Sequence, residues 1–344
     1  MALSVTNVAS VSRAEVTWLW PGYIPRGALT IIEGDPGSMK TTLTIDLAAR
    51  ITTGGALPQC EDRVEPGNVL LIQDEDLPAA TRAKLESAGA DLSNVEIYDR
   101  TNAASAPFTL PNDVNDLDTH IRERSAQLVV VDPITPFITG SMNSEQAIRR
   151  ALNPLASVAA RTGATILLVR HLTKGGSGAA LYRGIGSIGL IALARAALLV
   201  ARDPGDAERR VLAVTKSSLG AIPSSLAFRM EDNGSGPQVE WLGESQYTAE
   251  QLSRTTHSTD QPVLDEAVYL LFSLLGRGPL PARRAIDNAA AEGVSRRTLQ
   301  RAKAILGVCS RRHGFGPGSR FDWELDEDNP RVRQLRAAEE ATGE

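Results

Sequence analysis

The sequence has little cysteine and no long apolar run. Two cysteines, Cys60 and Cys309, occur among 344 residues, and they form no CxxC pair. Neither a disulfide framework nor a zinc site is therefore indicated. The longest apolar stretch, 188–201, is interrupted by Arg195 and is too short to cross a bilayer. Because the first 20 residues also lack the pattern of a secretory signal, we expect a cytoplasmic protein with no membrane partner.

Lysine is scarce as well. There are 36 Lys and Arg together, but only five are lysines, Lys40, Lys84, Lys174, Lys216 and Lys303. The net charge of -5 argues against a protein that coats nucleic acid with its whole surface, although it allows a local basic patch. An apolar fraction of 42% with 22% charged residues excludes collagen-like, disordered and coiled-coil chains. The length predicts one large and one small domain.

Short apolar runs alternate with helical stretches over residues 27–243, and this alternation predicts an α/β domain with a mainly parallel sheet flanked by helices. The expected buried strands are 28–34, 68–75, 95–99, 128–132 and 165–171. Helical spacing occurs at 41–51 and 144–161. Four later strands, 196–202, 210–216, 225–230 and 238–243, are expected to form an antiparallel extension.

A second, smaller domain is expected after a polar linker at 244–262. Three helices and two strands around a Gly-Pro-Gly turn predict a winged helix over 263–325, with Ser295 as an N-cap and Gly307 as a helix stop. Residues 1–26 are interpreted as an N-terminal arm and 326–344 as a polar tail.

The strongest motif, GDPGSMKTT, lies directly between an apolar strand and an apolar-periodic helix, which is the position of a P-loop. The nucleotide-binding residues predicted there are Gly34, Asp35, Pro36, Gly37, Ser38, Met39, Lys40, Thr41 and Thr42. We expect Lys40 to contact the β- and γ-phosphates of ATP, and the Thr41 hydroxyl to hold Mg²⁺. A glycine-rich turn that only resembles a P-loop is the alternative.

Met39 departs from the motif, because GxxxxGK[ST] has glycine at that place. Since the position lies at the start of a helix, we expect a negative φ there, which a side chain tolerates. The expected consequence is altered nucleotide affinity rather than its loss.

Three polar side chains at strand ends complete the predicted catalytic site, because parallel sheets bind ligands at the carboxyl ends of their strands. Asp132, which ends LVVVD, is predicted to order Mg²⁺, although such an Asp is also a common loop cap. Glu75 in QDED is predicted to activate water; Asp74, Asp76 or a merely solvated acidic loop are the alternatives. His171 is a candidate sensor that hydrogen-bonds either the γ-phosphate or the attacking water, or else a structural histidine.

In this order, GDPGSMKTT, QDED, VVVDP, VRHLTKG and VTKSSLG resemble the RecA-like ATPases of the plasmid RepA replicative helicase type. The resemblance covers about residues 16–243. It implies a RecA-like fold, a ring such as a hexamer, nucleotide bound between subunits and single-stranded DNA near the centre. It also implies that Lys216 is a finger that reaches the neighbouring subunit's γ-phosphate; an edge-strand lysine is the alternative.

Two basic segments are predicted to contact DNA. The glycine-rich segment after His171 carries Lys174 and Arg183 and no acidic residue, which suits a loop that tracks single-stranded DNA, or else a purely structural loop. From Ser295 to Arg320 there are seven basic residues and no Asp or Glu. The predicted contacts to duplex DNA in this block are Arg296, Arg297, Arg301, Arg311 and Arg312. A solvated basic face or a protein-binding winged helix is the alternative.

The sequence thus predicts an ATP-hydrolysing, DNA-acting motor of replication or recombination. The main competing hypothesis is a nucleotide-gated DNA-binding regulator or loader without helicase activity. A signalling ATPase with protein partners is disfavoured by the basic block, and no acceptor pocket of a metabolic kinase is indicated.

Overall fold

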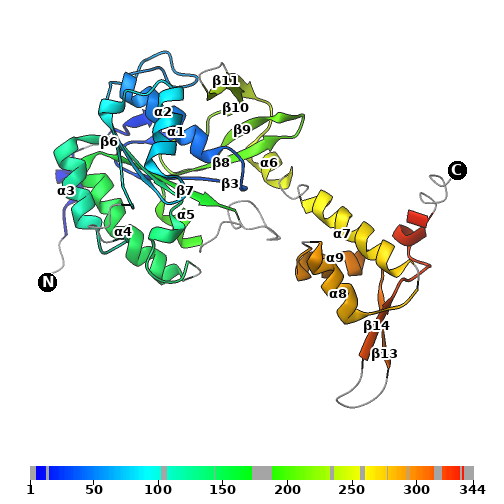
Figure 1. Ribbon diagram of the computed structural model, residues 1–344. Helices are drawn as coiled ribbons and strands as arrows, with labels where there is room; N and C mark the ends of the chain where they lie inside the picture. The colour runs from blue at the N-terminus through cyan, green and yellow to red at the C-terminus, as the bar shows by residue number, and fades with distance from the viewer. Residues whose placement is uncertain are drawn as a thin grey trace. The chain divides into compact units, whose positions relative to one another are not determined.

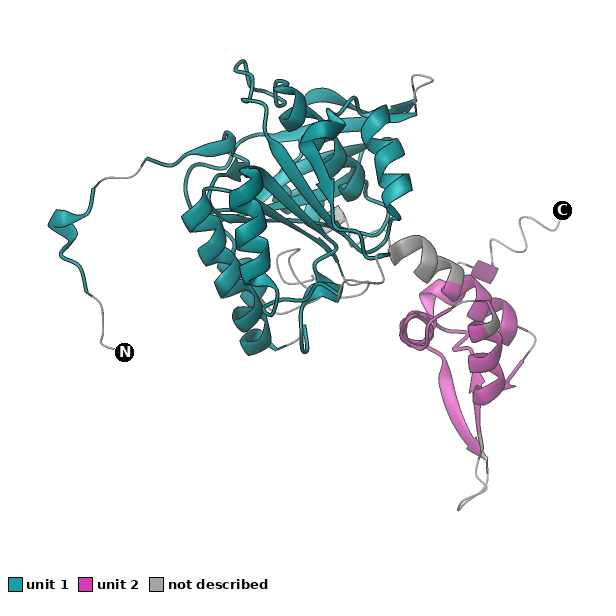
Figure 2. Cartoon of the chain, turned by 60° about the vertical axis from the view of Figure 1, so that its left-hand side comes forward, with its two compact units in different colours: residues 1–256 teal, residues 257–344 magenta. Residues whose placement is uncertain are grey.

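The computed structural model describes residues 5–12, 15–101, 107–142, 144–172, 188–232, 236–255, 260–276, 278–292, 294–313, 320–333 and 335–336. The chain divides into two compact units, 1–256 and 257–344, which are coloured separately in Figure 2. Each unit has its own core and is described by itself.

A nine-stranded sheet forms the centre of unit 1 in the part of the chain that the structure describes (Figure 1). Its spatial order is β11 (Pro237–Ser245), β10 (Ser225–Asp232), β9 (Asp206–Ser217), β8 (Ala196–Asp203), β3 (Leu29–Gly34), β7 (Thr165–His171), β6 (Ala126–Asp132), β4 (Asn68–Gln73) and β5 (Val95–Ile97). The strands from β8 to β5 are parallel, and β9, β10 and β11 are antiparallel. The prediction that β8 belongs to the antiparallel extension holds on one edge only, because β8 pairs antiparallel with β9 but in parallel with β3. A separate hairpin, β1 (Trp18–Trp20) and β2 (Ile24–Pro25), precedes the sheet.

Helices cover both faces of this sheet, which is why its central strands are mostly apolar. Side chains alternate between two cores, so Ile31 of β3 packs with α3 (Val114–Arg124), α4 (Glu145–Thr162) and α5 (Ile188–Leu193), whereas Ile32 packs with α1 (Lys40–Thr53) and α2 (Pro78–Ser87). Figure 1 shows α1 and α2 on one side of the sheet and α3 and α4 on the other. This is the predicted α/β class, a RecA-like P-loop core.

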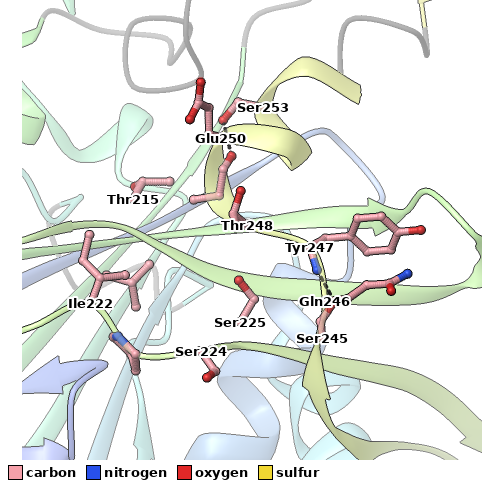
Figure 3. Close-up of a pocket in the computed structure, with 13 residues that line it drawn as sticks. Thr215, Ile222, Ser224, Ser225, Ser245, Gln246, Tyr247, Thr248, Glu250 and Ser253 are labelled. Atoms are coloured by element: carbon pink, nitrogen blue, oxygen red, sulfur yellow. Dashed lines mark hydrogen bonds between the residues drawn. The ribbon is translucent and has the colours of Figure 1, made fainter.

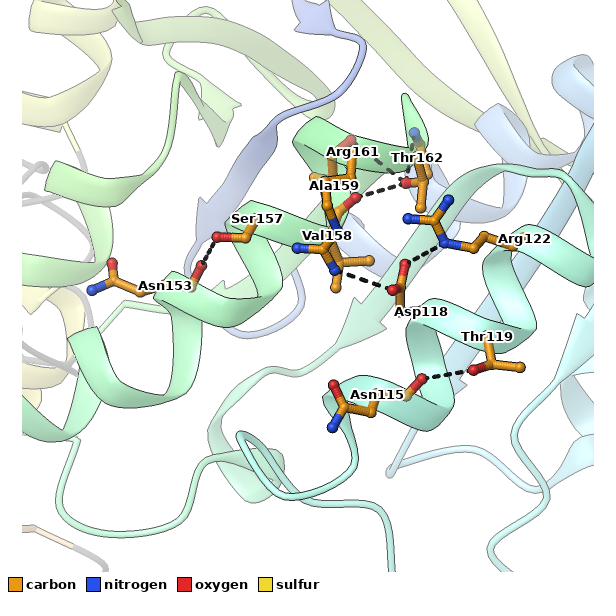
Figure 4. Close-up of polar contacts among 11 residues, drawn as sticks. Asn115, Asp118, Thr119, Arg122, Asn153, Ser157, Val158, Ala159, Arg161 and Thr162 are labelled. Carbon is orange, nitrogen blue, oxygen red and sulfur yellow. Dashed lines mark hydrogen bonds and ion pairs between the residues drawn. The ribbon is translucent and has the colours of Figure 1, made fainter. Parts of the chain in front are cut away.

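Polar contacts on the outer surface join α3 to α4 (Figure 4). Asp118 of α3 accepts hydrogen bonds from Arg122 Nε at 3.0 Å and from Arg161 of α4 at 3.1 Å. Both arginines are about half exposed, so these ion pairs contribute little to the free energy of unfolding. The two helices present their apolar faces to the same core.

Part of the expected linker is helical. Residues 249–255 form α6 (Ala249–Thr255), and its Leu252 is fully buried with Leu199 and Val211 against β8 and β9. A single buried leucine in a seven-residue helix gives no apolar periodicity, so the sequence pattern could not reveal it. The sheet itself also continues to Ser245, beyond the expected end at 243.

Unit 2 combines helices with a small antiparallel sheet. Its elements are α7 (Asp260–Leu275), β12 (Leu280–Pro281), α8 (Ala282–Ala291), α9 (Arg296–Ile305), β13 (Cys309–His313) and β14 (Arg320–Glu324), and the strand order is β12-β14-β13. The predicted N-cap is confirmed, because Ser295 Oγ accepts from the Thr298 amide at 3.1 Å. Gly307 follows α9 with a φ of 62°, as expected of a helix stop. No helix in the described parts of either unit is long and apolar enough to span a bilayer.

Candidate nucleotide site and basic surface

Four adjacent parallel strands deliver the predicted catalytic residues to one edge of the sheet. In spatial order, β3 leads into the P-loop, β7 ends at His171, β6 ends at Asp132, and β4 precedes Glu75. Gly34 lies in register with His171, and Gln73 with Asp132. Residues far apart in the sequence therefore meet at the carboxyl ends of these strands, where parallel sheets bind ligands.

The loop between β3 and α1 closes around Lys40. The Lys40 Nζ donates to the Gly34 and Asp35 carbonyls, both at 2.9 Å, and lies 3.3 Å from Ser38 Oγ. Burial lowers the pKa of this ammonium from 10.5 to about 8. The negative charges of Asp132 and of other nearby carboxylates act in the opposite direction and raise the pKa, but their effect is smaller. A Cβ at Gly34 would lie 2.3 Å from the Val200 carbonyl oxygen, so only glycine fits there.

Met39 has the left-handed conformation, with φ 71° and ψ 25°. The expectation of a negative φ at this position is wrong, because Met39 is the N-cap before α1 and lies outside the helix, which begins at Lys40. Glycine adopts this conformation without a steric penalty, whereas a side chain is disfavoured there. Met39 therefore places strain directly beside the lysine of the P-loop.

Thr41 and Asp132 are in direct contact. The Thr41 Oγ1 donates to Asp132 Oδ2 at 2.7 Å. Burial raises the pKa of the Asp132 carboxyl, and the hydrogen bond from Thr41 opposes that rise. The other carboxylate oxygen, Oδ1, is buried and has no hydrogen-bond partner within the described residues. A hydroxyl beside a buried carboxylate oxygen that lacks a partner is a donor set that suits Mg²⁺.

Two of the three acidic residues after β4 have cationic partners. Asp74 pairs with Arg100 at 3.0 Å, and Asp76 pairs with Lys84 at 2.6 Å. These ion pairs hold both carboxylates in the loop. They also account for Lys84, for which the sequence pattern indicates no role in the nucleotide site.

Glu75 lies between these two residues and contacts His171 instead. Its Oε1 is 3.2 Å from His171 Nε2, and its carboxylate is more than half exposed. The charge of Glu75 also bears on the pKa of both Asp132 and Lys40, so it lies within electrostatic reach of the P-loop. His171 Nδ1 is buried and has no hydrogen-bond partner in the described part of the chain.

Lys216 contacts backbone carbonyls of its own chain. Its Nζ donates to the carbonyls of Ile191 and Ala194 at 2.8 Å and of Ala192 at 3.3 Å, which are the carbonyls at the end of α5. A cation at this end of a helix satisfies carbonyls that have no partner within the helix. Burial lowers the pKa of the Lys216 ammonium.

The predicted DNA contacts differ in how far the structure describes them. Lys174 and Arg183 lie outside the described residues. In unit 2, Arg296, Arg297 and Arg301 are exposed on α9 and Arg312 is exposed on β13. The remaining predicted contact, Arg311, pairs with Glu324 at 2.5 Å and is itself largely exposed.

Two other residues of the basic block have surroundings that the sequence pattern does not indicate. Lys303 points toward the small sheet, with its Nζ 2.6 Å from Ser310 Oγ and 4.4 Å from the centre of the Trp323 ring. Ile305 is 38% exposed, whereas Leu299 of the same helix is buried. Ile305 is the last residue of α9.

A cavity of about 670 Å³ lies elsewhere in unit 1, between the start of β10 and α6 (Figure 3). Its lining is rich in hydroxyl groups and includes Thr215, Ser225, Tyr247 and Thr248. The predicted nucleotide-site residues do not line this cavity. The candidate site therefore rests on the four converging strand ends and not on this cavity.

Two charged residues behind the site were missed by sequence reasoning. Glu33 of β3 and Arg170 of β7 are fully buried and form an ion pair. The available signal was a charged residue within each of two otherwise apolar strands, LTIIEG and TILLVRH.

The chain has recognisable relatives. The DNA repair protein RadA of Brucella abortus (strain 2308) is 25% identical over 231 residues, 65% of this chain and 44% of that protein. RadA of Streptococcus pneumoniae (strain ATCC BAA-255 / R6) is 24% identical over 307 residues, 86% of this chain and 62% of that protein. The chain thus spans less than two thirds of these relatives. A family model described as AAA domain matches residues 1–177, just over half of the sequence. The chain belongs to this AAA domain family.

Proposed function

We propose that the protein is an ATP-dependent motor that acts on DNA. The observation that carries this proposal is the convergence of Lys40, Thr41, Asp132, Glu75 and His171 on one sheet edge. Similarity to RadA DNA repair proteins supports DNA as the partner.

Each side chain of the site has a distinct task. Lys40 would exchange its loop carbonyls for phosphate oxygens of ATP, and Thr41 and Asp132 would hold Mg²⁺. When bound, Mg²⁺ neutralises charge on the phosphates. Glu75 would accept a proton from the attacking water. It is the choice among the three acidic residues of its loop because it contacts His171, whereas Asp74 and Asp76 are paired with Arg100 and Lys84. His171 would orient Glu75 through their contact.

We further propose a ring-forming replicative helicase or translocase of the RepA type. The order of motifs through VTKSSLG supports it, and single-stranded DNA would pass near Lys174 and Arg183. The finger role of Lys216 requires its ammonium to leave the α5 carbonyls before it contacts a neighbouring subunit's phosphate.

Unit 2 is proposed to be a winged helix that binds duplex DNA. Exposed Arg297 and Arg301 on α9 support this role, with Arg311 and Arg312 on the hairpin against backbone phosphates. Replacing both Arg297 and Arg301 with Ala should weaken duplex binding at least tenfold and flatten its salt dependence. The matched control is Arg82→Ala, which removes an exposed arginine of α2. Unchanged binding would leave unit 2 as a protein-binding module.

The decisive experiment measures ATP hydrolysis with and without single-stranded DNA, alongside unwinding of a forked duplex. Wild type should hydrolyse ATP faster when DNA is present and should open the fork. Lys40→Ala should neither hydrolyse ATP nor open the fork. Normal hydrolysis by Lys40→Ala would refute the site. Stimulated hydrolysis without unwinding would refute the helicase and leave a translocase.

A second candidate function is a nucleotide-gated DNA-binding regulator or loader. The left-handed conformation of Met39 favours it, because strain beside Lys40 is expected to slow hydrolysis more than binding. This function predicts DNA affinity that changes with bound ATP although turnover is negligible.

A further inference from the structure

A buried ion pair lies directly behind the nucleotide site. Glu33 of β3 is 0% exposed and Arg170 of β7 is 1% exposed. The Arg170 Nε donates to Glu33 Oε2 at 2.8 Å, and a second guanidinium nitrogen donates to the same oxygen. Two nitrogens on one oxygen fix the relative position of the side chains more narrowly than a single contact does.

The position of this pair ties it to the site. Glu33 and Arg170 are partners in the β3–β7 register, and the next partners are Gly34 and His171. The Gly34 carbonyl accepts from Lys40 Nζ at 2.9 Å and from the Leu172 amide at 3.2 Å. The ion pair is therefore one residue away both from the first residue of the P-loop and from the sensor that contacts Glu75.

Packing alone does not account for two charges at this place. The preceding residues on the same face of these strands, Ile31 and Leu168, are apolar and fully buried in one core. An apolar pair would continue that pattern, and replacing a buried ion pair with apolar residues is often neutral or stabilising. What the charges add is a directional link between two strands.

We propose that Glu33 and Arg170 are positioning residues, which set the placement of the P-loop relative to His171 for ATP hydrolysis. This inference rests on the proposed ATPase function. Neither side chain reaches the nucleotide in this scheme. Each acts through its neighbour, Glu33 through the Gly34 carbonyl and Arg170 through His171. Because Lys40 also contacts the Asp35 carbonyl and Ser38, we expect ATP still to bind without the pair, so its loss should affect turnover more than binding.

The test replaces both members together, Glu33→Leu with Arg170→Leu, so that no charge is left buried without its partner. The control is Ile166→Ala, which removes buried side-chain volume from the far end of β7, where Ile166 lies in register with Leu29. In the full-length protein, kcat should fall at least tenfold in the double variant while KM for ATP changes less than threefold. When kcat is calculated per folded molecule, the control should stay within twofold of wild type.

A second pair of variants covers a failure to fold. Arg170→Lys keeps the charge but not the two-nitrogen contact, and it should also lower kcat with little change in KM. The reversed pair, Glu33→Arg with Arg170→Glu, should recover more kcat than either single reversal. A double leucine variant or an Arg170→Lys variant with wild-type kcat would overturn the proposal, as would a loss that the control reproduces.

Hydrogen exchange separates this proposal from the proposed function. The Leu172 amide, which donates to Gly34, should exchange at least tenfold faster in the double leucine variant, or in Arg170→Lys if the former does not fold, than in Ile166→Ala. This measurement needs no turnover, so it decides the positioning role even if wild type fails to hydrolyse ATP. Equal exchange in these proteins would overturn the role.

Discussion

At Met39 the chain places a side chain in a backbone conformation that favours glycine, with a φ of 71°. The side chain also packs partly against the core that contains α1, so replacing it removes packing as well as strain. A comparison of two small residues isolates the backbone effect, because Gly and Ala both remove the methionine packing.

We predict that Met39→Gly is more stable than Met39→Ala by about 1 kcal/mol, because Ala retains the left-handed penalty and Gly does not. The measurement is the free energy of unfolding from urea denaturation. The opposite order, which is usual for exposed positions inside helices, would mean that Met39 does not hold this conformation in solution.

The meeting of the candidate nucleotide-site residues at one sheet edge was predictable, because their positions follow from strand ends. An apolar run that stops at Asp132 or His171 marks a strand and its carboxyl end together. The conformation of Met39 and the pairing of Glu33 with Arg170 were not predictable, because loop closure sets the first and strand order sets the second. Neither feature can be predicted from the local spacing of apolar residues.

At the scale of elements, the long buried strands were predictable and the short helices were not. The helix α3 is an exception, because its buried residues Val114, Leu117 and Ile121 have a helical spacing that is visible in the sequence. For α5 and α6 the helices are too short to show a period. Such short helices depend on tertiary contacts, and the end of α5 is held by Lys216.

We predict that Lys216→Met lowers the free energy of unfolding of unit 1 by about 1–2 kcal/mol, because carbonyls at the end of α5 lose a charged donor. The control is Lys84→Met, which breaks the partly exposed contact with Asp76 and should cost about 0–1 kcal/mol. Chemical denaturation followed by circular dichroism measures both. Equal effects would show that the cap contributes no more than an ordinary surface ion pair.

At the scale of the whole molecule, the overall charge of -5 conceals an uneven distribution. Residues 262–325 carry ten Lys and Arg against six Asp and Glu, so this segment is basic, whereas unit 2 as a whole carries 13 of each and the chain is acidic. The cores are divided in the same way. One cluster draws all its members from residues 267–335, and the other three draw theirs from residues 19–252.

Separate cores predict separate unfolding. Leu271→Ala removes a fully buried side chain of unit 2 and should lower the stability of that unit by about 2–5 kcal/mol, leaving the transition of unit 1 unchanged. Ile166→Ala should do the reverse. Thermal unfolding of the full-length chain, with MgATP added to mark unit 1, resolves the two transitions, because a ligand raises the melting temperature only of the unit that binds it. A single transition that both substitutions shift equally would mean that the two units unfold together. A shift of the unit 2 transition by MgATP would place part of the nucleotide site outside residues 1–256.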